Sequence, residues 1–417
     1  MTTFGQQNFT ETAALKFFLA SFSILLLVQF PISAPVVTTL IFYTAIAPSL
    51  IVFLFYKRKN TFGIIKENKL LAIWCIYFAA IIIHTFFFSQ PSQPTFKILK
   101  QTLFTFIFFL SSTVFFVKMP RDTLMKLFYA IGIIAGISAL ISILIHYNLY
   151  QDFNNRLKPI GRANHETLGS LLYTIAAMLG LYSINKTNAV NRYKRLSVYI
   201  AVLLIGTMVV LTRSRMPMIL FFSYVPIVIL WTQPRHLIFT ATVIMASLCL
   251  SFYALLPESS NAFIKEMSSY FDGLASRGTA YRNELWSLTI SEIQKAPIFG
   301  NGMYAKLNHS ESHSVHNLYL SHAYHMGFYG LIAFLVCIAC TGINTLRIAI
   351  KRLNNSFLTL SLLYICLLSG LTEFSQPVKS PSPMWFIIWM PIGWAVGLSI
   401  LERRSQQRAP QKTTPSA

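Results

Sequence analysis

Residues 124–146 read LMKLFYAIGIIAGISALISILIH, an almost wholly apolar run in which Lys126 carries the only charge. A membrane-spanning helix needs about 20 predominantly apolar residues, because it rises only about 1.5 Å per residue. This stretch therefore predicts a transmembrane helix. Similar runs recur from one end of the chain to the other, so the same prediction extends to the whole protein.

The composition agrees with a bilayer environment. The 417 residues are 54% hydrophobic and only 11% charged, against about 25% charged in an ordinary soluble domain. We expect an all-α integral membrane protein with about twelve transmembrane helices. The expected spans are 14–31, 35–56, 70–88, 98–117, 124–146, 166–184, 196–212, 215–231, 236–256, 321–346, 357–373 and 383–401.

These spans divide the chain into four parts. Residues 1–256 hold transmembrane helices one to nine, and residues 257–320 form one large loop. Residues 321–401 hold helices ten to twelve, and residues 402–417 form a polar tail that is expected to be disordered.

Basic residues gather on one side of the predicted membrane. The loops after even-numbered spans and the two termini hold 21 basic and four acidic residues, a net charge of +17, whereas the other side holds 13 basic and nine acidic residues, a net charge of +4. Cytoplasmic loops are normally enriched in Lys and Arg, so we expect both termini in the cytoplasm. The net charge of +21 is then mostly a topology signal, and no nucleic-acid partner is expected.

The large outer loop has two predicted helical stretches. In 284–295 an apolar stripe of Leu285, Leu288 and Ile293 follows helical spacing, and Pro297 ends the helix. The glycine-rich segment 298–302 predicts a turn. A second helix, 317–329, leads into the tenth span.

Seven of the 13 basic residues on the outer side are of particular interest, because positive charge is normally sparse there. Arginine binds phosphate oxygens bidentately, and charges at a membrane boundary tend to mark substrate pathways. We therefore consider an anionic, lipid-linked phosphate as substrate. The residues are Arg156, Lys158, Arg162, Arg213, Arg215, Arg277 and Arg282.

Each of these charges also has a plainer interpretation. Arg213 and Arg215 lie in a loop of only a few residues and could anchor the chain at lipid headgroups. Arg282 could form a surface ion pair with Glu284 or Asp272.

Five histidines crowd into the end of the large loop and the start of the tenth span: His309, His313, His316, His322 and His325. The i,i+3 spacing of His313/His316 and of His322/His325 raises the question of a metal site, but Glu311 is the only carboxylate close by. A single histidine acting as a general base is the better interpretation, because imidazole titrates near neutral pH. His316, where the loop re-enters the membrane, is the candidate, and no metal or cofactor is expected. The remaining histidines are expected to be packing groups.

Several of these residues form an ordered pattern. Arg282-x-x-x-Trp286, Pro297-x-x-Gly300-x-Gly302 and His316-Asn317-x-Tyr319, then Gly327 and Gly330, resemble the conserved region of the O-antigen ligase/polymerase superfamily. Thr212-x-Ser214-Arg215 and Gly161-x-x-Asn164 match other recurring pieces of that superfamily.

The resemblance implies a membrane glycosyltransferase of GT-C-like architecture in the bacterial inner membrane, with its large catalytic loop in the periplasm. Such ligases transfer a glycan from undecaprenyl pyrophosphate to a sugar hydroxyl of lipid A-core, with inversion and without a metal, completing lipopolysaccharide. By the resemblance, His316 would be the general base, and Arg215 and Arg282 would hold the pyrophosphate. Arg162, Arg213 and Arg277 are further candidates for pyrophosphate binding. The expected partners are the lipid-linked glycan, lipid A-core and membrane lipids.

Three other functions stay open at the level of sequence. An O-antigen polymerase uses the same donor. A protein O-oligosaccharyltransferase often has a further region after its last span, whereas this sequence ends soon after Leu401. A flippase or other transporter of lipid-linked oligosaccharides should carry charges near the middle of its spans, but the outer charges here lie at span ends and in one loop.

Overall fold

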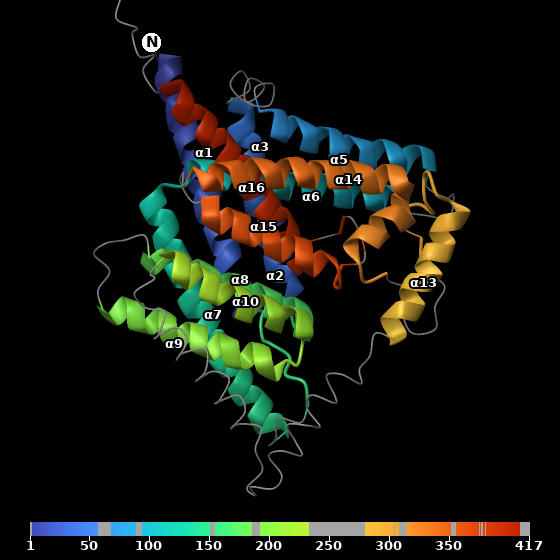
Figure 1. Cartoon of the computed structure of the whole chain (residues 1–417). Helices are drawn as coiled ribbons and strands as arrows, with labels where there is room; N and C mark the ends of the chain where they lie inside the picture. Colours follow the sequence, from blue (N-terminus) through green and yellow to red (C-terminus); the bar gives the residue numbers. More distant parts are fainter. Residues whose placement is uncertain are drawn as a thin grey trace, which may run out of the picture.

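The protein is described here from a computed structural model. It covers residues 2–56, 68–88, 94–150, 155–185, 192–232, 280–303, 305–307, 315–351, 356–374, 376, 378–379 and 381–408. Within these ranges the chain folds into helices and contains no β-strand (Figure 1). This confirms the predicted all-α class.

The described ranges contain the following helices, in chain order. They are α1 (Thr2–Leu27), α2 (Pro35–Ile41), the π-helical η1 (Phe42–Ile46), α3 (Ala47–Tyr56), α5 (Lys69–Phe88), α6 (Thr95–Lys118), α7 (Arg121–Tyr150), α8 (Glu166–Asn185), α9 (Arg192–Leu211), α10 (Arg215–Thr232), α13 (Ala280–Lys295), α14 (Leu318–Ile350), α15 (Ser356–Gly370), the π-helical η3 (Trp385–Trp389) and α16 (Met390–Arg408).

The membrane character of the fold is confirmed. In the described ranges, eight helices are long and apolar enough to cross a membrane, and the apolar helices Thr12–Leu27 and Ser356–Gly370 are shorter. Eleven of the twelve predicted spans fall on helices, with η1 joining α2 and α3 into one span. The ninth, 236–256, lies outside the described residues, as does the predicted boundary at 256/257. The total number of spans therefore stays a prediction.

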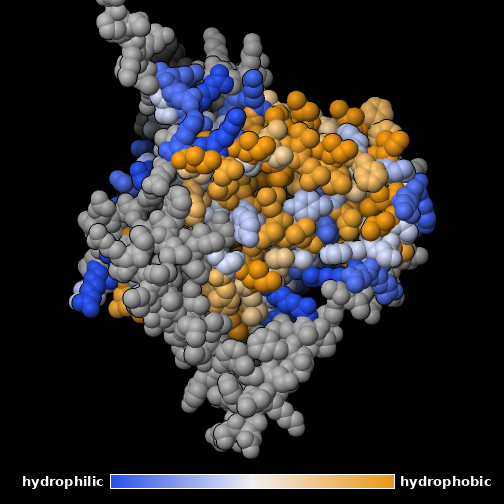
Figure 2. Space-filling view, viewed as in Figure 1, coloured by the Kyte–Doolittle hydropathy of each residue, from blue (hydrophilic) through white to orange (hydrophobic). Residues whose placement is uncertain are grey.

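The surface has an apolar band with polar ends. In Figure 2, apolar side chains form a broad region over α5 and α14, between hydrophilic side chains near the outer ends of α1 and α16 and others around α13. Exposed residues such as Ile76, Phe87, Ile332 and Ile343 belong to this apolar surface. A band of this kind is what lipid tails cover in a membrane protein.

Among the helix boundaries that differ from the sequence prediction, two concern carboxylates. The predicted tail begins at residue 402, but α16 continues to Arg408. Its last turns are supported because Lys351 Nζ and Gln406 Nε2 donate to Glu402 Oε1 at 3.1 and 3.2 Å. The eleventh span ends at Gly370 rather than at 373, and Glu373 therefore stands in the connection that follows.

Aromatic and small side chains hold the bundle together. The Trp385 ring of η3 packs against Phe42 of η1 and Phe108 of α6, with ring centroids 4.8 and 4.7 Å apart. Helices α7 and α8 meet through Gly132 and Gly180, where a Cβ on Gly132 would lie 2.8 Å from the Gly180 Cα. Small residues permit such close approach between membrane helices. The apolar window of α8 is 94% buried, so α8 runs through the interior of the bundle.

Candidate active site

His316 occupies a special backbone position just before α14. Its φ is +51°, in the left-handed region that few residues other than glycine adopt. The next residue, Asn317, caps α14 by accepting hydrogen bonds from the backbone N–H groups of Tyr319 and Leu320 at 2.9 and 3.0 Å. Tyr319 in turn donates its hydroxyl to the Leu367 carbonyl of α15 at 2.9 Å. The His316-Asn317-x-Tyr319 motif thus fixes the place where the chain turns into α14.

The surroundings of His316 favour the neutral imidazole. Burial lowers the pKa of His316 from its usual value, and the positive charges of Arg282, His165 and Lys379 lower it further. An imidazole with a lowered pKa is unprotonated at neutral pH and can accept a proton. The three charged residues come from α13, from the loop between α7 and α8, and from the connection between α15 and η3, whereas His316 precedes α14. His316 is therefore the centre of a group that is far apart in sequence.

Arg282 is paired with a carboxylate that the sequence did not single out. Its Nη2 donates to Glu373 Oε1 at 3.2 Å, and the Arg282 side chain is 42% exposed while that of Glu373 is 8% exposed. Burial raises the pKa of Glu373 to about 7, although the charges of Arg282 and Arg156 oppose this rise. This partner is more distant in sequence than the predicted Glu284 or Asp272, and Asp272 lies outside the described residues. Glu373 is thus poised to ionise near neutral pH.

The turn between α9 and α10 brings further arginines to this region. Arg213 has a φ of +51°, and Arg215 is exposed at the first position of α10. Arg156, given less weight from the sequence, donates from Nε to the Thr212 carbonyl at 3.1 Å and from Nη2 to Ser214 Oγ at 2.9 Å. Because the Arg156 charge also acts on Glu373, this turn lies beside the Arg282–Glu373 pair.

Arg162 is engaged mainly by the protein itself. Its Nε donates to Thr38 Oγ1 at 3.0 Å and its Nη2 to the Pro381 carbonyl at 2.7 Å. Its backbone N–H donates to the Gln29 carbonyl at 2.8 Å. The preceding Gly161 has a φ of +106° and lies against the carbonyls of Gln29 and Phe30, where a side chain would not fit. Arg162 therefore links its own loop to three other segments of the chain.

A loop–helix junction sets the position of α13. Helix α14 is interrupted at Gly327, whose φ and ψ are 70° and −173°. The freed carbonyls of Tyr324 and His325 accept hydrogen bonds from the backbone of Asn301 and Gly302 at 2.8 and 3.0 Å. Phe328 N donates to the Pro297 carbonyl at 2.8 Å. The glycines of the Pro297–Gly302 motif and Gly327 are thus required for this close backbone contact, rather than for chemistry.

The same junction is supported by an apolar contact. The predicted stripe on α13 is confirmed: Leu285 and Ile293 are buried against α14 residues Ala323 and Tyr324, and Leu288 packs at the edge of this cluster. Because α13 rests on α14, the position of Arg282 relative to His316 is fixed by packing as well as by hydrogen bonds.

The two histidines at the start of α14, His322 and His325, are packing groups. His322 is fully buried, with Nε2 2.7 Å from the Tyr77 hydroxyl and Nδ1 2.7 Å from the Leu318 carbonyl. His325 Nδ1 lies 2.9 Å from the Gly302 carbonyl. No three His, Cys, Asp or Glu side chains in the described ranges form a metal-binding group. The predicted candidates Arg277, His309 and His313 lie outside those ranges.

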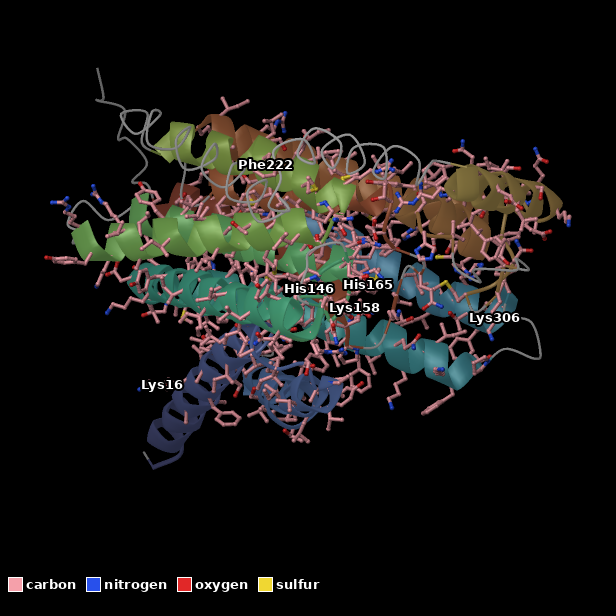
Figure 3. The ribbon with its side chains drawn as sticks, turned by 90° about the horizontal axis from the view of Figure 1, so that it is seen from below. Lys16, His146, Lys158, His165, Phe222 and Lys306 are labelled. Carbon is pink, nitrogen blue, oxygen red and sulfur yellow. The ribbon has the colours of Figure 1, made fainter. Side chains whose placement is uncertain are left out.

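Figure 3 shows the loop that contributes His165. The labelled Lys158 and His165 lie between the region of α8 to α10 and that of α13 and α14, whereas Lys306 lies far to one side. His165, Lys379 and Glu373 were not predicted from the sequence as members of the site. A carboxylate at the end of a predicted span was the one signal that could have drawn attention to Glu373.

Two comparisons with known proteins bear on this site. The sequence model of the O-antigen ligase family matches residues 200–335, which include Arg215, Arg282 and His316. An O-antigen ligase of Pseudomonas aeruginosa is 21% identical over 338 residues, covering 79% of this chain and 78% of the relative. The superfamily was also indicated by the motifs in the sequence. Together these matches support the placement of this chain in the O-antigen ligase superfamily.

Proposed function

We propose that this protein is an O-antigen ligase. It takes a glycan from undecaprenyl pyrophosphate at the periplasmic face of the bacterial inner membrane and joins it to a sugar hydroxyl of lipid A-core. The observation that carries the proposal is the histidine His316, whose pKa is lowered by burial and by nearby cations, next to the partly exposed Arg282. A base and a cation side by side suit an acceptor hydroxyl and a lipid diphosphate.

In this proposal the arginines bind the leaving group. Negative charge grows on the pyrophosphate as the glycosidic bond breaks, so guanidinium groups aimed at it stabilise the transition state more than the ground state. Arg282 and Arg215 are assigned this role, because both belong to the matched motifs and neither is fully buried. Arg213 and Arg277 remain candidates for the same role. Arg162 is assigned a positioning role, since two of its guanidinium nitrogens already donate within the protein.

His316 is assigned the role of general base. The acceptor hydroxyl gives its proton to the imidazole as it attacks the anomeric carbon, opposite the departing pyrophosphate, so the configuration inverts. The donor is already activated and the cationic side chains neutralise the leaving group, so the proposal needs neither a nucleotide nor a metal.

A transporter is disfavoured by where the charges lie. Arg282 stands on α13, His316 just before α14, and Lys379 in the connection after α15. A transporter would be expected to bind its substrate near the bilayer midplane, between broken helices. Charges gathered at helix ends fit chemistry at the membrane surface better.

The proposal is tested with purified protein, lipid-linked glycan and lipid A-core. We expect Arg282→Ala to lower the transfer rate roughly a hundredfold, the effect typical of a lost electrostatic contact in the transition state. Lys295→Ala is the matched control, because Lys295 is a 68% exposed cation on the same helix that pairs with its neighbour Glu292. Equal losses in both variants, or none in Arg282→Ala, would refute the assignment of Arg282.

The choice between ligase and polymerase needs a separate experiment. Deletion of the gene is followed by gel analysis of the lipopolysaccharide. Loss of a ligase leaves bare lipid A-core and an accumulation of lipid-linked glycan. Loss of a polymerase leaves core that carries a single repeat unit, and this result would overturn the ligase proposal. A protein O-oligosaccharyltransferase would leave the lipopolysaccharide unchanged.

A further inference from the structure

A cavity lies at the end of the helix bundle opposite α13. It has a volume of about 490 Å³ and is bounded by the first turn of α5, the last turns of α14 and the last turns of α16. Its lining combines polar residues with the apolar residues Leu70, Ile73, Cys340 and Ile343. The cavity therefore offers both polar and apolar groups, called here its polar and apolar sides, at the ends of three membrane helices.

The polar side is positively charged. Lys69, Arg347 and Arg403 line it together with one carboxylate, Glu402, so the lining carries a net charge of +2. Glu402 is itself held by Lys351 Nζ at 3.1 Å. No ion pair between described residues engages Lys69, Arg347 or Arg403. Three cations that converge on one space without a carboxylate of their own are suited to an anion.

Neutral polar groups complete the same wall. Asn68 caps α5 through Leu71 N at 3.0 Å and donates from Nδ2 to Ser399 Oγ at 3.1 Å. Asn344 also lines the cavity, and its Nδ2 is buried without a hydrogen-bond partner among the described residues. A buried donor without a partner is costly, and a phosphate oxygen in the cavity would satisfy it.

The apolar side leads from the cavity onto the lipid-facing surface. Ile343 is 59% exposed at the cavity, and Val336 and Ile332, further along α14, are 51% and 58% exposed. The opposite wall begins at α5, where Ile76 is 68% exposed. A ligand with an anionic head and an apolar tail would match both sides, whereas a soluble anion would match only one.

We propose that this cavity binds the phosphate headgroup of an anionic membrane phospholipid, with an acyl chain lying along α5 and α14. The charge pattern of the sequence predicts this end of the bundle to be cytoplasmic, so the lipid would come from the inner leaflet. The site lies at the other end of the membrane helices from His316, and it does not depend on the glycan-transfer proposal.

The experiment measures lipid retention by native mass spectrometry of the full-length protein in detergent. Phosphatidylglycerol is compared with phosphatidylethanolamine. The variant Arg347→Gln/Arg403→Gln removes two cations from the cavity. The matched control Arg192→Gln/Lys194→Gln removes two exposed cations from the start of α9, on the same predicted face. Cys340→Phe keeps every charge but fills the cavity. It tests the same site even if the double variant does not fold.

We expect wild type and control to retain phosphatidylglycerol over phosphatidylethanolamine. The cavity variant should bind it more weakly by a factor of about five for each charge removed, and Cys340→Phe should also lose it. Equal weakening in the control would show a general surface effect and overturn the proposal, as would full retention by Cys340→Phe. Inorganic phosphate is added in a third arm. If phosphate alone displaces the lipid at millimolar concentration, the cavity is a soluble-anion site and the lipid assignment is wrong.

Discussion

At the scale of single residues, the site is defined by groups whose protonation is set by their neighbours. The pKa of His316 is lowered by its burial and by the charges of Arg282 and Lys379 among its neighbours, while burial raises the pKa of Glu373. Arg282 faces both groups, because its charge acts on His316 and its Nη2 contacts Glu373. A change at His316 should therefore appear in the turnover number, and a change at Glu373 in the KM for the donor.

The role of His316 can be separated from its backbone conformation. Asparagine tolerates the left-handed region better than most residues, so His316→Asn keeps the φ of +51° at little cost while it removes the base. We expect the turnover number to fall by a factor of about 100 to 10,000. Thermal stability and gel-filtration behaviour should stay close to those of wild type.

The pH dependence of turnover follows from the same residue. The lowered pKa of His316 means that the base is neutral at pH 7 and becomes protonated only at acid pH. With saturating donor, the protonation of His316 should leave the wild-type turnover number unchanged between pH 8 and pH 7. The turnover number should fall only at a pH below about 6.5, the usual pKa of histidine. A turnover number that rises on acidification would exclude a neutral His316 as the base.

Glu373 should control donor binding rather than turnover. Above its pKa of about 7 the carboxylate is ionised and holds Arg282, and below it the proton releases Arg282 for the pyrophosphate. The KM for the donor should therefore rise between pH 6 and pH 8, by up to about fivefold for a partly exposed pair. In Glu373→Gln the KM for the donor should not rise between pH 6 and pH 8, while the turnover number should still fall at acid pH as His316 is protonated. The same rise of KM in the variant would contradict this role of Glu373.

At the scale of elements, the recurring glycines act on architecture. Gly327 interrupts α14, and the 297–302 loop fills the gap with three backbone hydrogen bonds. Sequence analysis predicted the turn and both flanking helices, because glycine spacing and apolar periodicity are local signals. It did not predict the interruption of α14, because that conformation depends on a loop about 25 residues away in the chain.

Substitution of Gly327 tests the junction. Its φ and ψ lie in a region open almost only to glycine, and a Cβ there would overlap the Ile298 carbonyl. Gly327→Ala should lower stability by roughly 1–3 kcal/mol and reduce transfer, measured as the thermal midpoint in detergent and the transfer rate. Gly342→Ala is the matched control on the same helix, since a Cβ there meets no atom within 4 Å. It should be neutral or stabilising by up to about 1 kcal/mol.

At the scale of the whole molecule, the apolar spans could be predicted from the sequence, whereas the residues of the site could be predicted only in part. A span shows itself in a local run, as residues 124–146 do within α7. The motif residues His316 and Arg282 were found because they stand out in a polar loop. The sequence did not single out Glu373, Lys379 and His165, because no neighbouring motif marks them. They come close to His316 and Arg282 only when α14, α15 and the α7–α8 loop pack together in the fold.

The orientation of the molecule in the membrane rests so far on charge counting, and labelling with a membrane-impermeant maleimide can test it. Lys295 at the end of α13 and Ser405 in the last turn of α16 are exposed. Helix α13 and the C-terminal end of α16 lie at opposite ends of the bundle (Figure 1). In intact bacterial cells with a permeabilised outer membrane, Lys295→Cys should be labelled, and Ser405→Cys only after the inner membrane is opened. The native cysteines in the described ranges, Cys75, Cys337, Cys340 and Cys366, are buried or partly buried within helices, and the wild-type protein measures their background together with that of Cys249. Labelling of Ser405→Cys alone in intact cells would invert the topology and place His316 in the cytoplasm, where a ligase acting on periplasmic lipid A-core could not work. Because +17 of net charge is predicted on the Ser405 side against +4 on the other, we expect the first result.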